Sequence, residues 1–217
     1  MRRLALAALA LILASPVLAQ GRGEAAGRGG TPGEFDFYVL SLSWSPSWCA
    51  TTGESRGSRQ CETGRNPGFV VHGLWPQYER GFPSDCDAVS RAPSRIAMEE
   101  AAGVFPEDGL ARYQWRKHGS CSGLDPASYF RAARRAKEAV TIPDGLSGGR
   151  LAPIEIARRF VAANPGLRPD MMAVTCRRDR LEEVRVCFTK DLRGFARCPE
   201  VARGNCRAGD VLVEAGR

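Results

Sequence analysis

Hydrophobic and polar residues alternate between Phe35 and Trp44. The apolar positions of this stretch are Tyr38, Leu40, Leu42 and Trp44. Side chains of a strand point alternately to its two faces, so the pattern predicts a strand with one buried face. A second apolar run, from Phe69 to Val71, leads directly into His72 and predicts a buried strand that Pro76 ends.

A helical pattern begins near Pro106. Gln114 and His118 are four residues apart, and Lys117 follows Gln114 by three, so the three side chains share one helix face. Gly119 fits a C-terminal cap, which places His118 at the helix end. A cation gains there from the helix dipole, so we expect the protonated imidazole to be favoured.

The rest of the chain predicts further elements of both kinds. The expected helices are 93–102, 127–140 (opened by an Asp125 N-cap and Pro126) and 154–163, and the expected strands are 171–176, 181–189 and 210–214. Strands and helices do not alternate as βαβ units. The pattern therefore indicates an α+β fold, with a central antiparallel sheet flanked by helices in a single disulfide-stabilised domain.

The first residues resemble a targeting segment. Residues 1–19 combine a short basic start, an apolar run too short to span a membrane and a small-residue cleavage pattern, which predicts a signal peptide. An uncleaved anchor is the alternative. Residues 20–33 are rich in Gly, Arg and Ala and predict a flexible segment, so the domain is expected over 34–217, in the periplasm or outside the cell. We expect the mature chain to be monomeric and not bound to a membrane.

Eight cysteines in an exported chain predict four disulfides, although spacing alone allows 105 pairings. The first loop is expected to be closed by Cys49 and Cys61. Zinc is the competing interpretation. Cys121 follows His118 by three residues, but one such pair does not form a tetrahedral site, so we expect no metal and no other cofactor.

The formal charge of the chain is +7 at pH 7. A basic exported domain favours contact with a polyanion such as nucleic acid, anionic lipid or a bacterial surface. Compositional bias in an arginine-rich chain explains the same charge equally well.

The chain has two histidines, and each precedes a glycine and lies near a tryptophan. Two histidines at one site can exchange protons as general acid and general base near neutral pH. The chain has no phosphate-binding loop and no dinucleotide fingerprint, and its cysteines are expected to be paired. A pair of histidines without a nucleophile of the protein suits a substrate that carries its own nucleophile.

RNA is such a substrate, because its 2′-OH attacks the neighbouring phosphate. The reaction needs a base, an acid and a cation, which His72, His118 and Lys117 supply without a metal. DNA lacks the 2′-OH, so the same site is not expected to cut it. Trp75 and Trp115 are candidates for stacking on bases, although packing in the core is the commoner role of tryptophan.

Two segments together resemble the ribonuclease T2 family of secreted ribonucleases. His72-Gly73-Leu74-Trp75-Pro76 is similar to the first active-site segment of that family, and Trp115-Arg116-Lys117-His118-Gly119-Ser120-Cys121 to the second. Residues 35–48 resemble the family's opening strand, and the last four cysteines resemble its terminal set.

The resemblance implies roles for these residues. His72 and His118 match the catalytic pair, with His118 as base and His72 as acid in the first step. Lys117 matches the residue that stabilises the pentacovalent phosphate, and Trp75 matches a base-site aromatic. We add Gln77 to the substrate-binding candidates. The implied disulfides are Cys86–Cys121, Cys176–Cys206 and Cys187–Cys198, with Cys49–Cys61 remaining.

One departure from the family lies directly before the second segment. The family commonly has His-Glu where this chain has Tyr113-Gln114. Gln114 can donate a hydrogen bond to a phosphate but cannot ionise, and the Tyr113 hydroxyl can replace one phosphate contact in part. Because the histidine pair and the lysine are intact, we expect activity to survive with a changed rate or pH optimum.

The sequence therefore predicts an endoribonuclease that cleaves single-stranded RNA through a 2′,3′-cyclic phosphate to a 3′-phosphate, with weak base preference. The first alternative is a catalytically impaired protein that uses the same scaffold to bind RNA or a surface, which Tyr113-Gln114 favours. A metal-dependent phosphodiesterase is the second, although no acidic cluster joins the histidines in the sequence.

Overall fold

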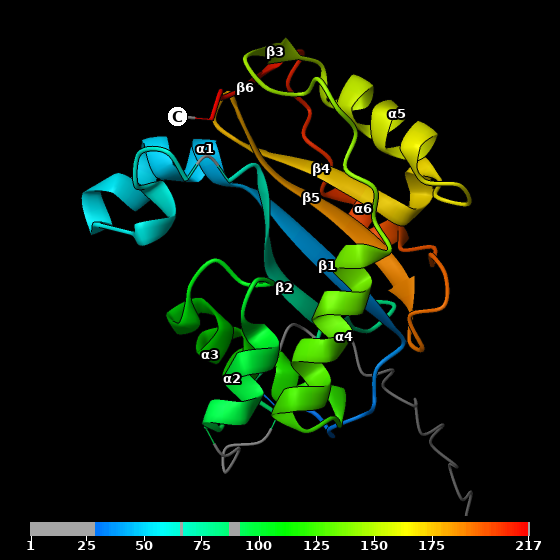
Figure 1. Cartoon of the computed structure of the whole chain (residues 1–217). Coiled ribbons are helices and arrows are strands. Elements are labelled where there is room, and N and C mark those ends of the chain that lie inside the picture. The colour runs from blue at the N-terminus through cyan, green and yellow to red at the C-terminus, as the bar shows by residue number, and fades with distance from the viewer. Residues whose placement is uncertain (1–28, 66, 87–91, 217) are drawn as a thin grey trace, which may run out of the picture.

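The computed structural model describes residues 29–65, 67–86 and 92–216. They form a six-stranded sheet with the strand order β2-β1-β5-β6-β3, and β4 pairs with β5 beside this path (Figure 1). Neighbouring strands are antiparallel except β5 and β6, which meet through one parallel pair, Arg180 and Leu212. The predicted α+β class and the sheet flanked by helices are confirmed.

The elements have the following bounds. The strands are β1 (Phe37–Trp44), β2 (Phe69–Gln77), β3 (Gly149–Leu151), β4 (Met172–Arg177), β5 (Arg180–Thr189) and β6 (Val211–Val213). The α-helices are α1 (Ser45–Trp48), α2 (Arg95–Ala101), α3 (Asp108–Lys117), α4 (Pro126–Glu138), α5 (Pro153–Ala163) and α6 (Pro199–Arg203). Short helical turns are η1 (Cys49–Gly53), η2 (Glu54–Arg56), η3 (Arg59–Cys61), η4 (Gly119–Ser122) and η5 (Pro169–Met171).

Alternation along β1 produces the buried face that the sequence predicts. Leu40 and Leu42 belong to the main hydrophobic core, whereas Phe37 and Val39 pack on the opposite face against the Cys187–Cys198 disulfide. The position of Ser41 on this second face is fully buried. Both faces of β1 are therefore covered around Ser41, whereas Ser43 on the same face is only partly buried.

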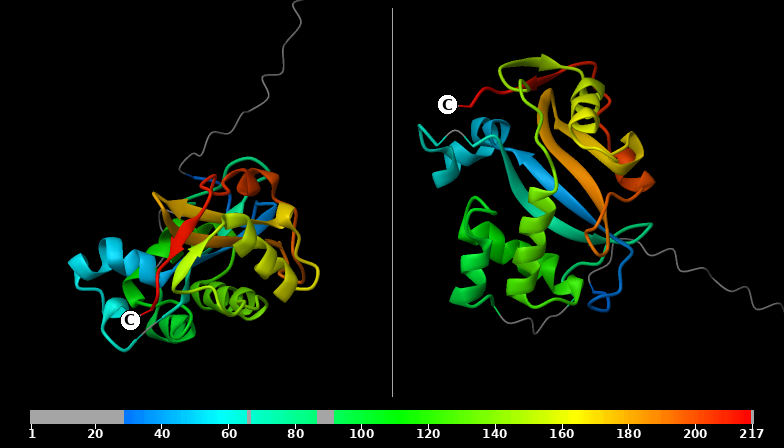
Figure 2. Two further views of the ribbon diagram at one scale, coloured as in Figure 1. Left: turned by 90° about the horizontal axis from the view of Figure 1, so that it is seen from above. Right: turned by 45° about the vertical axis from the view of Figure 1, so that its right-hand side comes forward.

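Helix α4 covers the main core face of β1 and β2, and α2 and α3 pack beside it (Figure 1). The Asp125 side chain caps α4 by accepting a hydrogen bond from the Ser128 amide, as the sequence predicts. The buried Tyr129 hydroxyl donates to the Leu74 carbonyl at 2.9 Å, which ties α4 to β2. Helix α5 packs on β4 at the other side of the molecule (Figure 2).

Strand β2 continues through Pro76 to Gln77, so the prediction that Pro76 ends the strand is wrong. Pro76 pairs with Tyr38 in the register of the sheet. Proline has no amide hydrogen and is tolerated on an edge strand, where one side of the backbone has no strand to bond. Strand β2 occupies such an edge in the strand order.

All four disulfides have the partners that the resemblance implies: Cys49–Cys61, Cys86–Cys121, Cys176–Cys206 and Cys187–Cys198. The Cys86–Cys121 bond is the one that bears on the site. It ties the segment after β2 to the turn after α3, and these are the two segments that follow the two histidines.

The expected signal peptide, residues 1–19, lies outside the described residues. Residues 29–33 were expected to belong to a flexible segment, but they are bonded to the domain. The Gly29 amide donates to the Ser84 carbonyl at 2.7 Å, and the Gly33 amide donates to the Cys121 carbonyl at 2.9 Å. The bonded fold thus begins before Glu34. In the part of the chain that is described, no helix is both long and apolar enough to cross a bilayer.

Candidate active site

An irregularity in β2 positions His72. Gly73 pairs with Ser41 and Val71 pairs with Leu42, so His72 is an extra residue in this strand. Such a bulge turns two successive side-chain positions to the same face. Val71 and Leu74 remain in the core, and His72 lies on the opposite face, where its side chain keeps 37% of its surface exposed.

Glu183 of β5 reaches the His72 ring across β1. The Glu183 Oε1 atom is 2.5 Å from the His72 Nδ1 atom. Register places Glu183 opposite Ser43 and Arg185 opposite Ser41. The serines of β1 are small, so the longer side chains of β2 and β5 can meet above them.

Glu183 is 4% exposed and ionised. Burial by itself raises its pKa, but the hydrogen bond and charge of His72, together with the charge of Arg185, outweigh burial and lower the pKa from 4.5 to about 2. A carboxylate only accepts hydrogen bonds, so the His72 Nδ1 atom carries the hydrogen and Nε2 is the nitrogen left to exchange a proton with a substrate. Arg185 holds the second carboxylate oxygen at 2.8 Å.

Trp75 stands between the two histidines. Its ring centroid is 5.3 Å from that of His72 and 5.3 Å from that of His118. The indole Nε1 atom donates to the Gln114 Oε1 atom at 2.8 Å, and the Arg185 guanidinium lies 5.3 Å from the ring centroid. Gln114 is 1% exposed, so this bond holds the indole from inside the protein.

The glycine after each histidine is required by close packing. A Cβ atom on Gly73 would lie 2.2 Å from the Trp75 Nε1 atom and 2.3 Å from the Gln114 Oε1 atom. A Cβ atom on Gly119 would lie 2.5 Å from the Trp115 ring. Each glycine therefore lets a large side chain lie close to the backbone beside a histidine.

Helix α3 brings Gln114, Lys117 and His118 to the site, but it ends differently from the prediction. The last helical residue is Lys117, and His118 itself is the C-cap, with φ −122° and ψ −43°. Gly119 begins the turn η4 and does not adopt the positive φ of a glycine cap. The expectation that Gly119 caps the helix is wrong, because its role is the packing described above.

The charge state of His118 is also opposite to the expectation. His118 is 7% exposed, and its Nδ1 atom is buried without a hydrogen-bond partner among the described residues. Burial lowers the pKa of His118 from 6.5 to about 3, and the charges of Lys117 and His72 act in the same direction. These effects exceed the attraction of the helix dipole, so the imidazole is neutral at pH 7.

Lys117 and Tyr113 lie one turn apart on α3. The Lys117 Nζ atom is 5.7 Å from the Tyr113 ring centroid, and Arg116 lies 5.5 Å from the same ring. Tyr113 is 41% exposed. Within the described residues no carboxylate forms an ion pair with Lys117. The structure thus places a cation beside His118, and no described carboxylate pairs with it.

Of two further predicted substrate-binding residues, Trp115 lies in the core, whereas Gln77 lies on β2 beyond Trp75. Trp115 is 5% exposed and packs in the core against Tyr129, with ring centroids 5.7 Å apart, so it cannot stack on a base. Gln77 lies at the end of β2, where its amide donates to the Pro76 carbonyl at 2.9 Å. The sequence could not separate Trp115 from Trp75, because only packing decides which indole is buried.

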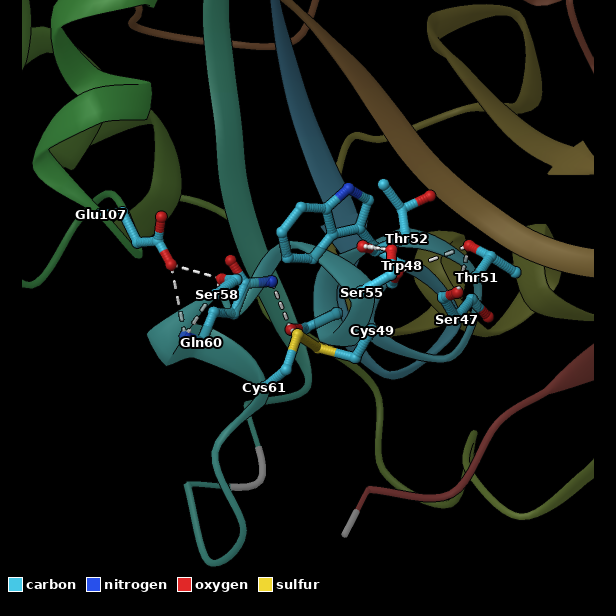
Figure 3. Close-up of a disulfide and its surroundings, with 11 residues drawn as sticks. Ser47, Trp48, Cys49, Thr51, Thr52, Ser55, Ser58, Gln60, Cys61 and Glu107 are labelled. Carbon is cyan, nitrogen blue, oxygen red and sulfur yellow. Dashed lines mark hydrogen bonds between the residues drawn. A yellow bond between two sulfur atoms is a disulfide. The ribbon is translucent and has the colours of Figure 1, made fainter.

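A cleft of about 460 Å³ opens beside His72. Its walls come from β1, β2, the start of α3, the β4–β5 hairpin and the loop that follows α1, and they include Trp48, Gln60, His72, Leu110 and Glu183. Figure 3 shows the loop wall, in which the Ser58 side chain and the Gln60 backbone amide face Glu107 and the Cys49–Cys61 bond closes the loop. The cleft offers space for part of a nucleotide beside a proton-exchanging histidine.

Sequence reasoning missed Glu183 and Arg185. The signal was present in β5, where Val184, Val186 and Phe188 define the core face. Glu183 and Arg185 take the alternate positions, so charged residues were to be expected on the opposite face. Which strand would lie beside β1, and therefore which acid would reach His72, could not be read from that pattern.

Comparisons with known proteins point to one family. The family model named Ribonuclease T2 family matches residues 35–198. A ribonuclease from Aeromonas hydrophila is 45% identical over 119 residues, which cover 54% of this chain and 52% of that protein. The chain thus matches about half the length of this relative.

Solved structures share the fold at low sequence identity. An RNase-related protein from Calystegia sepium has a TM-score of 0.67 and 20% identity, over 85% of this chain and 99% of that one. RNase NT in complex with 5′-AMP has a TM-score of 0.59 and 22% identity, over 84% and 99%. The family match spans both histidine segments and the strands β1 to β5, and on this ground the chain belongs to the Ribonuclease T2 family.

Proposed function

We propose that this protein is an endoribonuclease that cleaves single-stranded RNA without a metal ion. The observation that carries the proposal is the placement of both histidines against one indole, with Lys117 next to His118. An acid, a base and a cation within one site are the groups that intramolecular cleavage of RNA requires.

In the first step the neutral His118 accepts the proton of the RNA 2′-OH. The 2′-oxygen forms a bond to phosphorus, and the bond from phosphorus to the 5′-oxygen of the next nucleotide breaks. His72 donates a proton to the departing 5′-oxygen, and Lys117 stabilises the negative charge of the phosphorane. Burial leaves His118 unprotonated at pH 7, as a proton acceptor must be, and the pKa of about 3 makes it a weaker base than a free imidazole. The product is a 2′,3′-cyclic phosphate.

In the second step the roles are exchanged. A water molecule gives a proton to His72 and attacks phosphorus, the bond to the 2′-oxygen breaks, and His118 returns a proton to that oxygen. A 3′-phosphate results. DNA provides no 2′-OH and is not a substrate.

Glu183 is a positioning residue in this proposal. Its carboxylate receives the His72 Nδ1 hydrogen and fixes both the ring and its tautomer, while Arg185 holds the carboxylate. A buried acid in this role supports a proton-exchanging histidine much as outer partners support metal-binding histidines. The acid comes from β5, whereas the second-segment position where the family commonly has Glu holds Gln114.

Weak base preference is part of the proposal. Trp75 offers an aromatic surface, and stacking accepts any base. RNase NT, which shares the fold, binds 5′-AMP in its solved complex, and we extend nucleotide binding to this chain. We also propose that the protein acts as an exported monomer, with residues 1–19 as its signal peptide and the domain from Glu34 onward as the catalytic unit.

The test is digestion of single-stranded RNA in excess EDTA by the wild type, His72→Ala and His118→Ala. We expect the wild type to remain active and each variant to lose activity by several orders of magnitude, with 2′,3′-cyclic ends on the wild-type products. Circular dichroism controls for folding. Full activity in either variant would contradict the mechanism. Loss of wild-type activity in EDTA would indicate a metal-dependent reaction.

A second candidate is an RNA-binding protein without turnover, which Gln114 in place of the usual acid favours. The same digestion separates the two. A folded wild type that binds RNA and leaves it intact supports the second candidate.

A further inference from the structure

A second hollow continues the cleft beside His72 along the loop that follows α1. Its volume is about 690 Å³. The two hollows share four lining residues: Trp48, Arg56, Pro106 and Glu107. A polymer bound at His72 can therefore pass from the first hollow into the second over one continuous wall.

The loop that separates the two hollows is held rigidly. Gln60 donates through its side chain to Ser45 at 2.5 Å, and Ser58 donates to the Glu107 carboxylate, which also accepts from the Gln60 amide at 3.4 Å (Figure 3). Together with the Cys49–Cys61 bond, these contacts fasten the loop to α1 and to the start of α3.

Trp48 is a fixed aromatic surface within this loop. A Cβ atom on Gly53 would lie 2.4 Å from the Trp48 ring and 2.4 Å from the Cys61 sulfur, so the indole packs tightly over the glycine and the disulfide. Trp48 is nevertheless only partly buried and lines both hollows. An indole held in this way can stack on a base without losing side-chain entropy.

Positive charge lies along the second hollow. Arg56 and Arg59 are exposed, and neither forms an ion pair within the described part of the chain. Arg65 also lines the hollow and pairs with Glu62 at 3.3 Å. Of the two acids in the lining, Glu107 is occupied by the loop hydrogen bonds, and Asp108 lies in the first turn of α3. Guanidinium groups without partners favour phosphate.

We propose that Trp48, Arg56 and Arg59 form a subsite for single-stranded RNA beyond the two nucleotides that flank the cleaved bond. Trp48 stacks on a base, and the two arginines contact backbone phosphates. The inference rests on the proposed function, because it assumes that RNA occupies the cleft at His72. It predicts that the protein prefers long single strands to dinucleotides.

The test measures binding of single-stranded DNA, which fills the groove and is not cut. Dissociation constants for a dinucleotide, a tetramer and a decamer are measured at several salt concentrations. We expect the decamer to bind the wild type most tightly. In Arg56→Ala/Arg59→Ala its binding should weaken about tenfold at low salt, with a salt slope smaller by about 1.4, since each single-strand phosphate contact contributes about 0.7.

The matched control is Arg203→Ala/Arg207→Ala. It removes the same charge from two exposed arginines that line neither hollow. Its dissociation constants should equal those of the wild type within about twofold. Equal weakening in both double variants, or decamer binding no tighter than dinucleotide binding in the wild type, would overturn the subsite.

A second measurement separates the subsite from catalysis. Cleavage is compared on a ribodinucleotide and on DNA decamers that contain one ribonucleotide, placed near either end. We expect the ratio of kcat/KM for decamer to dinucleotide to fall about tenfold in Arg56→Ala/Arg59→Ala for at least one placement. An unchanged ratio contradicts the subsite. If the wild type binds decamers as expected but cuts neither substrate, the catalytic proposal fails and the subsite stands.

Discussion

His118 shows how strongly burial can oppose the dipole of a helix. The ring lies at the C-terminal end of α3, where a cation is favoured, yet its pKa is lowered to about 3. Removing the ring from water penalises the charged form, and Lys117 beside it adds repulsion. A neutral imidazole next to a lysine is therefore a consequence of tertiary packing, and it has a measurable effect on stability.

Acid should destabilise the protein through His118. The folded pKa of about 3 is below the ordinary 6.5, so the unfolded state binds the proton first and stability falls as the pH falls through this window. Between pH 7 and pH 5 the loss is about 2 kcal/mol in free energy of unfolding. Urea unfolding at both pH values measures it. His118→Asn should lack this loss, and an equal loss in the variant would refute the assignment. Glu183 does not interfere, because its own loss falls below pH 5, between the ordinary pKa of 4.5 and the folded pKa of about 2.

Glu183→Gln tests the positioning of His72. Glutamine has the same shape, so we expect the fold to persist, while kcat/KM for RNA falls roughly 10- to 100-fold. The fall should lie mainly in kcat, and the pH dependence of kcat/KM should shift, which a purely structural role would not cause. Glu155→Gln, in the partly buried Glu155–Arg159 pair of α5, is the control. A variant with wild-type kcat and pH profile would show that His72 does not depend on Glu183.

At the scale of elements, the bulge in β2 and the end of α3 meet at the Trp75–Gln114 hydrogen bond. The bulge turns His72 to the polar face, and α3 delivers Gln114, Lys117 and His118 to the same place. Gly73 permits the meeting, because its missing Cβ leaves room for the bond. The two elements are thus fitted to each other at a contact that tolerates no added atom.

Gly73→Ala should break this fit. The added Cβ would displace Trp75 or Gln114, and we expect a loss of about 1–3 kcal/mol in free energy of unfolding and a clear fall in RNA cleavage. Gly109→Ala is the matched control, because a Cβ there has nothing within 4 Å and lies in helix α3. That variant should be more stable by about 0.5–1 kcal/mol. Denaturant unfolding measures the stability of both variants. Similar stabilities would show that Gly73 is not required for the packing of Trp75 and Gln114.

At the scale of the molecule, the site lies where the helical part of the fold joins the sheet. Helices α2, α3 and α4 form one group beside β2, and β4, β5, β6 and α5 form another beyond β1 (Figures 1 and 2). His118 belongs to the first group and Glu183 to the second, with His72 between them. The Cys86–Cys121 bond and the hydrogen bond from the Asp85 amide to the Lys117 carbonyl (2.8 Å) hold the segment after β2 to the end of α3.

Removal of that covalent tie should affect the whole molecule. Cys86→Ser/Cys121→Ser opens a link with a sequence separation of 35, and we expect a loss of about 4 kcal/mol in free energy of unfolding. RNA cleavage should fall as well, because the link holds the segments that carry the histidines. Thermal unfolding and RNA digestion at low temperature measure the two effects. Retention of both stability and activity would show that packing alone holds the segments together.

The sequence by itself determined much of this protein. Alternation predicted β1, the Asp125 cap and Pro126 predicted α4, and the two histidine segments predicted the family. These features are local, since strand periodicity, caps and motifs depend on residues close together in the chain. The helix face of Gln114, Lys117 and His118 was predictable for the same reason.

Only the tertiary structure decided which residues complete the site. Glu183 lies 111 positions from His72, and strand order and the bulge bring the two together. Burial distinguishes Trp115, which lies in the core, from Trp75, which lies at the site. Burial also makes His118 neutral, whereas the helix dipole alone favours the protonated form. Because β2 is an edge strand, it continues through Pro76. Burial and strand neighbours arise from contacts between distant segments, and a pattern of neighbouring residues does not contain them.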